Sequence, residues 1–166
     1  MNKAKESRPF LNIETILPIL DEISIFAGLN ESQLYRVFHL LELVNYKKGE
    51  FIFETGDQPS HIYIVKKGLV KLMLNVGTFK IEKALFKEGE CFGESAAIGI
   101  MPHIADTIAV KDTELIVISR KTLLNLFETD KELFGILILN IARELSRRLH
   151  YTEDILLHYV GTTAKT

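Results

Sequence analysis

Hydrophobic residues in the first quarter of the chain recur at the spacing of an amphipathic helix. The repeating residues are Leu34, Val37, Phe38 and Leu41. Residues at i, i+3, i+4 and i+7 share one helix face, and Asn30 and Gln33 stand at capping-box spacing just before it. We therefore predict helices within residues 13–43, after a polar, flexible N-terminus over residues 1–12.

Residues 44–119 carry a different pattern, in which glycines separate short runs of β-branched and aromatic residues. The predicted strands lie within residues 51–53, 62–65, 69–74, 79–86, 104–110 and 115–118. Val70, Leu72 and Leu74 alternate with Lys71 and Met73, as in a strand with one buried face. Many short strands at turn spacing are typical of a β-sandwich or barrel.

The pattern returns to helix over residues 120–159, with a polar tail at residues 160–166. Thr129 and Glu132 stand at capping-box spacing ahead of Leu133. A long helix is predicted to follow, from about residue 130 to residue 159. Its apolar row is Leu137, Ile141, Leu145 and Leu149, continued by Ile155 or Leu156. The order helix, β-barrel, helix makes residues 13–159 a single domain.

This apolar row is too long for one small barrel to cover. We expect the barrel to contact the first half, near Phe134 and Leu137, and to leave Leu149, Ile155 and Leu156 exposed. Such a stripe is uncommon on a monomer, and a two-fold pair is the commonest way to cover it. The pattern favours a homodimer through the C-terminal helix; the alternative is a bent helix that folds back on its own barrel.

Composition narrows the possible classes of function. The 166 residues suffice for one domain with a hydrophobic core, and the net charge of −2 gives no electrostatic case for nucleic acid. Cys91 is the only cysteine, which fits a reducing compartment. The N-terminus leads into no long apolar run, and the most apolar stretch, residues 133–142, is too short to span a bilayer. We expect a cytoplasmic protein without a membrane partner.

The candidate chemistry lies in residues 89–98, where Gly89 and Gly93 flank a phenylalanine and Glu94 opens a run of small residues. Glycine permits close approach of the backbone to a ligand. A helix that begins near Glu94 would point free N–H groups at an anion. A carboxylate beside those donors suits a ligand with both a phosphate and a hydroxyl group, whose proton Glu94 would accept.

This segment resembles the phosphate-binding cassette of cyclic nucleotide-binding domains, as in the catabolite activator protein and the regulatory subunits of protein kinase A. The family pattern is roughly F-G-E-x-A-x, followed by Pro-Arg-x-Ala. The residues in register are Phe92, Gly93, Glu94, Ala96, Pro102 and Ala105. Spaced glycine motifs at residues 48–57 and 62–68 extend the resemblance to roughly residues 20–158, and they imply a jelly-roll barrel, a double-stranded β-helix, followed by a long C-terminal helix.

The resemblance implies a set of ligand-binding residues for a cyclic nucleotide such as cAMP or cGMP. They are Gly93, Glu94, Ser95, Ala96, His103 and Ile104. Glu94 would accept the ribose 2′-hydroxyl, and the cassette backbone would bind the phosphate. The chain departs from the family at His103, which replaces the phosphate-binding arginine, and at Ile104, where the family often has a serine or threonine. These changes predict weak binding, or a different small anion.

Other functions have less support. A cupin-like metalloenzyme needs clustered histidines, whereas the five histidines are scattered. No helix-turn-helix follows the long helix in this chain, so direct DNA binding by that route is not expected. We interpret Cys91 as a core residue and Arg143, Arg147 and Arg148 as a solvated helix face. We therefore expect a non-catalytic regulatory module that signals to an unknown downstream protein; the alternative is a ligand-free interaction module.

Overall fold

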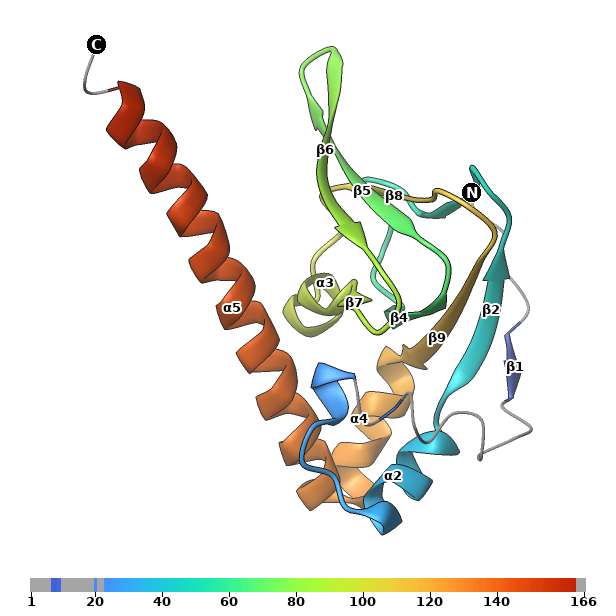
Figure 1. Ribbon diagram of the computed structural model, residues 1–166. Coiled ribbons are helices and arrows are strands. Elements are labelled where there is room, and N and C mark those ends of the chain that lie inside the picture. The colour runs from blue at the N-terminus through green and yellow to red at the C-terminus, as the bar shows by residue number, and fades with distance from the viewer. Residues whose placement is uncertain (1–6, 10–19, 21–22, 164–166) are drawn as a thin grey trace.

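The structure is a computed structural model that describes residues 7–9, 20 and 23–163 of the chain. Strands form a roll, helices pack against one end of it, and the last helix runs past the roll and away from it (Figure 1). The strands are β1 (Arg8–Pro9), β2 (Glu42–Tyr46), β3 (Phe51–Phe53), β4 (His61–Lys67), β5 (Val70–Val76), β6 (Phe79–Phe86), β7 (Cys91–Phe92), β8 (Asp106–Ala109) and β9 (Thr113–Ser119). The helices are η1 (Ser24–Phe26), α2 (Glu31–Phe38), α3 (Glu94–Gly99), α4 (Arg120–Thr129) and α5 (Lys131–Thr163).

Two antiparallel sheets make the roll, with strand orders β1-β2-β9-β4-β7 and β3-β8-β5-β6. Apolar side chains from both sheets, among them Phe53, Tyr63, Val65 and Phe92, fill the space between them. The predicted fold class is confirmed: the protein is mainly β, a jelly roll with flanking helices and a long C-terminal helix.

A second apolar cluster joins the helices to the outer face of the first sheet. In β4, Tyr63 and Val65 face the roll interior, while Ile62 and Ile64 pack with residues of the helices. Successive side chains of a strand point to opposite faces, so β4 is buried on both sides and is apolar over four consecutive residues. This strand therefore connects the roll, which carries the cassette, to the helical layer.

The N-terminal part differs from the sequence prediction in extent. The capping box of α2 is confirmed, because the Asn30 side chain accepts from the Gln33 N–H and the Gln33 side-chain oxygen accepts from the Asn30 N–H. β2 begins at Glu42, so the predicted helical region is too long at its end. Arg8–Pro9 pairs with β2, within the segment expected to be flexible. Residues 10–19, where part of the first helix was predicted, lie outside the described residues.

The C-terminal part consists of two helices. The cap of α5 is Asp130, whose carboxylate accepts from the Leu133 N–H at 3.1 Å, rather than Thr129 as predicted. α5 continues unbroken to Thr163, beyond the predicted end at residue 159, and 33 residues make it about 50 Å long. Leu137 and Ile141 are buried in the helical cluster. Asn140 is also buried, and its amide donates to the carbonyls of Ile25 and Ala27, which fixes η1 against α5.

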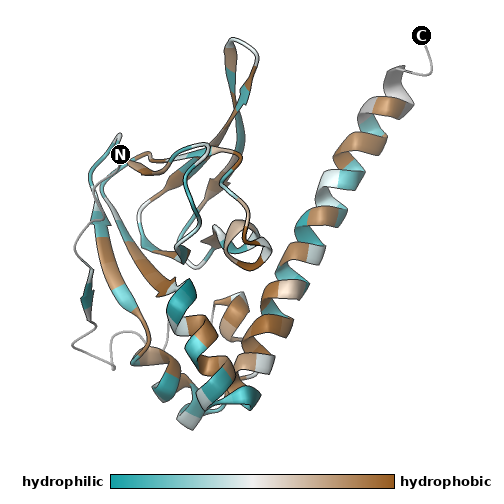
Figure 2. Ribbon diagram, turned by 180° about the vertical axis from the view of Figure 1, so that it is seen from behind, coloured by the Kyte–Doolittle hydropathy of each residue, from teal (hydrophilic) through white to brown (hydrophobic). Residues whose placement is uncertain are grey.

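The second half of α5 leaves the body of the protein with apolar side chains exposed. Hydrophobic segments continue along the helix almost to its C-terminal end (Figure 2). Leu149 is 60% exposed and Leu156 is 61% exposed. The second half of the helix is uncovered, as expected. The first half packs mainly on η1 and α4, whereas the barrel itself was expected to cover it. The helix does not bend back over its own roll (Figure 1).

Candidate functional site

Gly93 sets the position of the cassette. It follows β7, which pairs with β4 through Phe92 and Tyr63, and it precedes α3 with a φ of +81° in the left-handed region. A Cβ atom at this position would lie 2.9 Å from a ring carbon of Tyr63. Only glycine meets both requirements without strain, so the chain can turn sharply there and begin α3 at Glu94.

Glu94 is a buried carboxylate with one oxygen bound and one oxygen free. Its side chain is 2% exposed, and Oε1 accepts from Arg148 Nη1 at 2.6 Å. Oε2 has no hydrogen-bond partner among the described residues. Burial raises the pKa of Glu94, and the Arg148 guanidinium opposes that rise. The site thus presents one unsatisfied buried acceptor, which costs free energy unless a donor reaches it.

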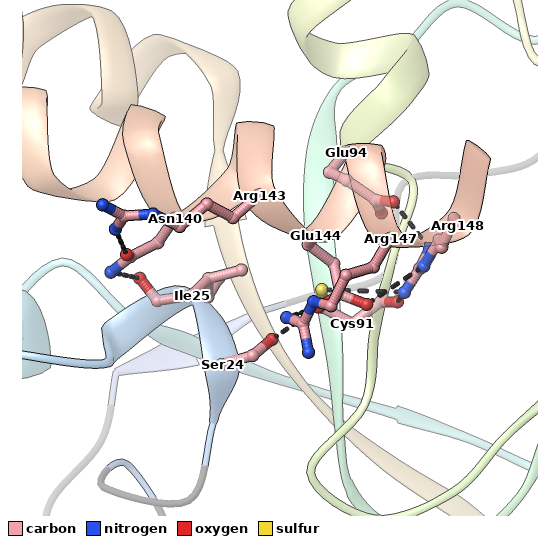
Figure 3. Close-up of polar contacts among 9 residues, drawn as sticks. All are labelled: Ser24, Ile25, Cys91, Glu94, Asn140, Arg143, Glu144, Arg147 and Arg148. Carbon is pink, nitrogen blue, oxygen red and sulfur yellow. Dashed lines mark hydrogen bonds and ion pairs between the residues drawn. The ribbon is translucent and has the colours of Figure 1, made fainter. Parts of the chain in front are cut away.

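Arg148 reaches this carboxylate from α5 (Figure 3). Its Nη2 donates to the Cys91 carbonyl, and its Nε donates to Glu144 Oε1 at 3.2 Å. The guanidinium also lies 5.3 Å from the centre of the Phe86 ring. Glu144 and Arg148, four residues apart on α5, form an ion pair. The interpretation of Arg148 as part of a solvated face is therefore wrong, because its guanidinium binds the buried Glu94.

A signal for Arg148 does exist in the sequence. The positions 137, 141, 144 and 148 are spaced by three or four residues, so Arg148 continues the buried face of α5 that begins with Leu137 and Ile141. The predicted apolar row continues instead through Leu145 and Leu149, which turns it toward the exposed face of α5. Helical spacing alone does not say which of two adjacent rows faces the roll.

The other predicted cassette residues lie in the first turn of α3. Ser95 is exposed and Ala96 is buried. The first backbone hydrogen bond of the helix runs from the Ala97 N–H to the Gly93 carbonyl at 3.1 Å. The neighbouring Cys91 is buried, and burial together with Glu94 raises the pKa of its thiol to about 12. This environment keeps the thiol protonated at neutral pH.

His103 is buried and packs into the roll. Its ring stacks on Phe53 with the ring centres 3.6 Å apart and the planes within 12°. Its backbone N–H donates to the Asp57 carbonyl, and its carbonyl accepts from the Gly56 N–H. Burial lowers the pKa of the imidazole, against the opposing charge of Asp57. Ile104 is 74% exposed, so the two departures from the family pattern have opposite environments.

A polar cluster that the sequence did not predict lies just after His103. Asp106 accepts from the Thr55 N–H and hydroxyl, each at 2.9 Å, and from Lys80 Nζ at 2.7 Å. The Lys80 ammonium, together with the Thr55 donors, lowers the pKa of Asp106 to about 2. These contacts join β8, the turn after β3 and the β5–β6 hairpin, and they hold the segment that contains His103. A single carboxylate in a strand gives no sequence signal for such partners.

A hollow of about 450 Å³ lies between α5 and the turn that joins β6 to β7. Phe86, Cys91, Glu144 and Arg148 are among its lining residues. Within the described residues, no three histidine, cysteine, aspartate or glutamate side chains gather as a metal site. The same part of the chain contains no helix that is long and apolar enough to cross a bilayer.

Comparison with known sequences identifies a family and relatives of this chain. A family model described as the cyclic nucleotide-binding domain matches residues 43–130, just over half of the chain. Human cGMP-dependent protein kinase 2 is 30% identical over 135 residues, covering 78% of this chain and 18% of the kinase. The cyclic AMP receptor protein of Thermus thermophilus is 30% identical over 126 residues, covering 75% of this chain and 56% of that protein. The chain thus spans well under two thirds of these relatives.

Solved structures agree on the fold. A cyclic nucleotide-binding domain from Methylobacillus flagellatus superposes with a TM-score of 0.79 at 20% identity, covering 88% of this chain and 83% of that one. The catabolite activator protein of Thermus thermophilus gives a TM-score of 0.73 at 29% identity, covering 83% of this chain and 63% of that one. The shared region includes the roll, and in both cases it exceeds four fifths of this chain.

Proposed function

The chain belongs to the cyclic nucleotide-binding domain family, and from that premise we propose that it is a non-catalytic regulatory module. It binds a cyclic nucleotide through the ribose and transmits occupancy to α5. The observation that carries this proposal is the buried carboxylate of Glu94, whose Oε2 lacks a partner while Arg148 of α5 binds Oε1.

A ribose hydroxyl has the chemistry that this acceptor needs. It donates one proton to Oε2, and a hydrogen bond to a charged group contributes about 1.5–3 kcal/mol. Because Glu94 is shielded from water, the bond gains strength from the low local dielectric constant. Burial raises the pKa of Glu94, and the Arg148 guanidinium opposes that rise, which favours the ionised carboxylate that can accept this bond. The contact also places a residue of α5 directly behind the ligand, which gives the helix a way to respond.

Phosphate binding is expected to be weak. Arginine would offer a permanent charge and a planar fork of donors, whereas His103 is stacked on Phe53 and burial lowers its pKa. Ile104 supplies no hydroxyl. The loss of one or two charge-assisted bonds corresponds to a roughly ten- to thousand-fold weaker affinity. The ribose therefore contributes a larger share of the affinity here than the phosphate does.

Calorimetric titration with cAMP, cGMP, adenosine and guanosine tests this proposal. We expect the cyclic nucleotides to bind weakly and Glu94→Gln to reduce their affinity about tenfold or more, because the amide is a poorer acceptor than the carboxylate. His103→Arg should strengthen the binding of cyclic nucleotides but not of nucleosides. Glu128→Gln, at an exposed position in α4, is the matched control.

If none of these four compounds binds at millimolar concentration, the proposal is contradicted. That outcome would favour the alternative, a domain that keeps the fold and acts as a ligand-free interaction module. Equal affinity of the wild type and Glu94→Gln would place the ribose elsewhere.

The proposal includes a homodimer formed by α5. Exposed residues follow heptad spacing along one face of this helix, with small residues at positions 142 and 146 and, apart from Glu153, large apolar residues from Leu149 onward. They are Leu139, Ala142, Ser146, Leu149, Glu153, Leu156 and Val160. A second copy presents the same face, so pairing about a two-fold axis buries the exposed apolar residues of both helices at once.

We expect Leu149→Asp and Leu156→Asp to shift the protein from dimer to monomer in sedimentation equilibrium at tens of micromolar. Each places a charge in an apolar contact that must then be desolvated. Tyr151→Asp is the control, because Tyr151 is exposed on the opposite side of α5 and should leave the dimer intact. A wild-type monomer, or a dimer that tolerates both leucine substitutions, would rule out this interface.

A further inference from the structure

Arg148 contacts Glu94 through a single hydrogen bond. Arginine and carboxylate commonly meet through two parallel N–H···O bonds. Here only Nη1 reaches Glu94, through Oε1. The remaining donors of the guanidinium are directed elsewhere, with Nη2 on the Cys91 carbonyl and Nε on Glu144 Oε1. Glu94 Oε2 stays without a partner for this reason.

Glu144 is itself fixed from the other side (Figure 3). Its Oε2 accepts from the Ser24 hydroxyl at 3.0 Å and from Arg147. The side chain is only 15% exposed, and η1, which carries Ser24, is tied to α5 by the buried Asn140. Glu144 is thus a fixed acceptor for the Nε edge of Arg148, and the Cys91 carbonyl holds Nη2 of the same guanidinium.

We propose that Glu144 is a positioning residue of the ligand site, which keeps Oε2 of Glu94 available to a ligand hydroxyl by holding the Nε edge of Arg148. The inference rests on the proposed function of Glu94 as the ribose acceptor. It assigns to Glu144, anchored by Ser24, the preference of the site for a ribose over a 2′-deoxyribose. Without Glu144, the fork of Arg148 can turn onto both oxygens of Glu94 and compete with the ligand for Oε2.

Glu144→Met removes the acceptor at similar length, whereas Glu144→Gln keeps one acceptor oxygen. A crystal structure of each variant without ligand gives the first readout. We expect Arg148 to bind both oxygens of Glu94 in the methionine variant and to keep a single bond in the glutamine variant. Glu128→Met in α4 is the matched control and should leave Arg148 unchanged. A single Arg148–Glu94 bond in Glu144→Met would overturn the proposal.

The second readout is the ratio of affinities for a cyclic nucleotide and its 2′-deoxy analogue. We expect the wild type to prefer the ribose form about tenfold or more, Glu144→Met to lose most of this preference, and Glu144→Gln to retain most of it. An unchanged preference in the methionine variant would count against the inference. A purely structural role would weaken both ligands equally and leave the ratio as it is.

Two further outcomes separate this inference from the proposed function. If the wild type binds no cyclic nucleotide, the proposed function fails, and the ligand-free structures still decide whether Glu144 orients Arg148. If Glu144→Met does not fold, Ser24→Ala takes its place. That variant removes one anchor of Glu144 and should produce a smaller loss of ribose preference; no change in either readout would overturn the proposal.

Discussion

Replacing Arg148 with methionine is expected to lower the free energy of unfolding by about 3 kcal/mol at pH 7, because the change leaves a buried carboxylate without its cation. Glu94 is almost fully buried and depends on Arg148 for its only side-chain partner among the described residues. We place the effect at the lower end for a buried pair because the Arg148 side chain is about one third exposed. Urea unfolding of both proteins measures the difference.

The loss of stability in Arg148→Met should become smaller as pH falls. Burial raises the pKa of Glu94 in the folded protein, and removal of Arg148 raises it further. An acid whose pKa is higher in the folded state binds its proton more tightly there, so stability falls as pH rises from the unfolded pKa to the folded one. The difference between variant and wild type should therefore shrink as pH falls from 7 to 5.

Arg147→Met is the matched control for this prediction. Arg147 is the neighbouring arginine of α5, is 64% exposed and has Glu144 as its ion-pair partner. Exposed pairs contribute about 0–1 kcal/mol, so its loss should be small and nearly independent of pH. A loss below 1 kcal/mol for Arg148→Met at pH 7, or a loss that grows toward acid pH, would show that Glu94 does not depend on this pair.

Gly93→Ala is expected to destabilise the protein by about 2–4 kcal/mol, with two physical causes. The left-handed backbone at Gly93 costs about 1 kcal/mol for a residue with a Cβ. The new methyl group would also lie 2.9 Å from the Tyr63 ring, which is buried and stacked on Phe92, so the packing must shift at a cost of about 1–3 kcal/mol. The midpoint of urea unfolding should fall, with the slope unchanged.

Gly89→Ala separates these two causes. Gly89 has a φ of +85°, close to that of Gly93, but no atom lies within 4 Å of an added Cβ. Its substitution should cost only the conformational part, about 1 kcal/mol. Equal losses for the two variants would mean that the contact with Tyr63 is not what requires glycine at the start of the cassette.

Local residue patterns were sufficient for much of the fold. Asn30 and Gln33 predicted the cap of α2 because a capping box is closed by residues three positions apart. β6 spans residues 79–86 as its run of residues predicted. The family resemblance, which the match over residues 43–130 confirms, rested on Phe92, Gly93 and Glu94. In each case a short segment carries the information, since the determining contacts are local.

The predictions of element bounds and of contacts failed where pairing between distant segments determines the structure. β2 begins at Glu42 because that residue pairs with Val117 of β9, and β1 forms only because β2 offers a free edge. Asp106 of β8 and Lys80 of β6 are 26 positions apart and meet across β5, the strand that lies between them in the sheet. No local pattern marks such partners.

The sequence by itself determined the cassette, because the turn at Gly93 and the carboxylate of Glu94 are properties of adjacent residues. It also determined that the C-terminal helix has more apolar surface than one roll covers. Only the tertiary structure decided which arginine enters the site. Arg147 and Arg148 are neighbours of the same type, but they lie about 100° apart around α5. The packing of Leu137 and Ile141 against the helical layer turns Arg148 toward Glu94 and leaves Arg147 largely in solvent.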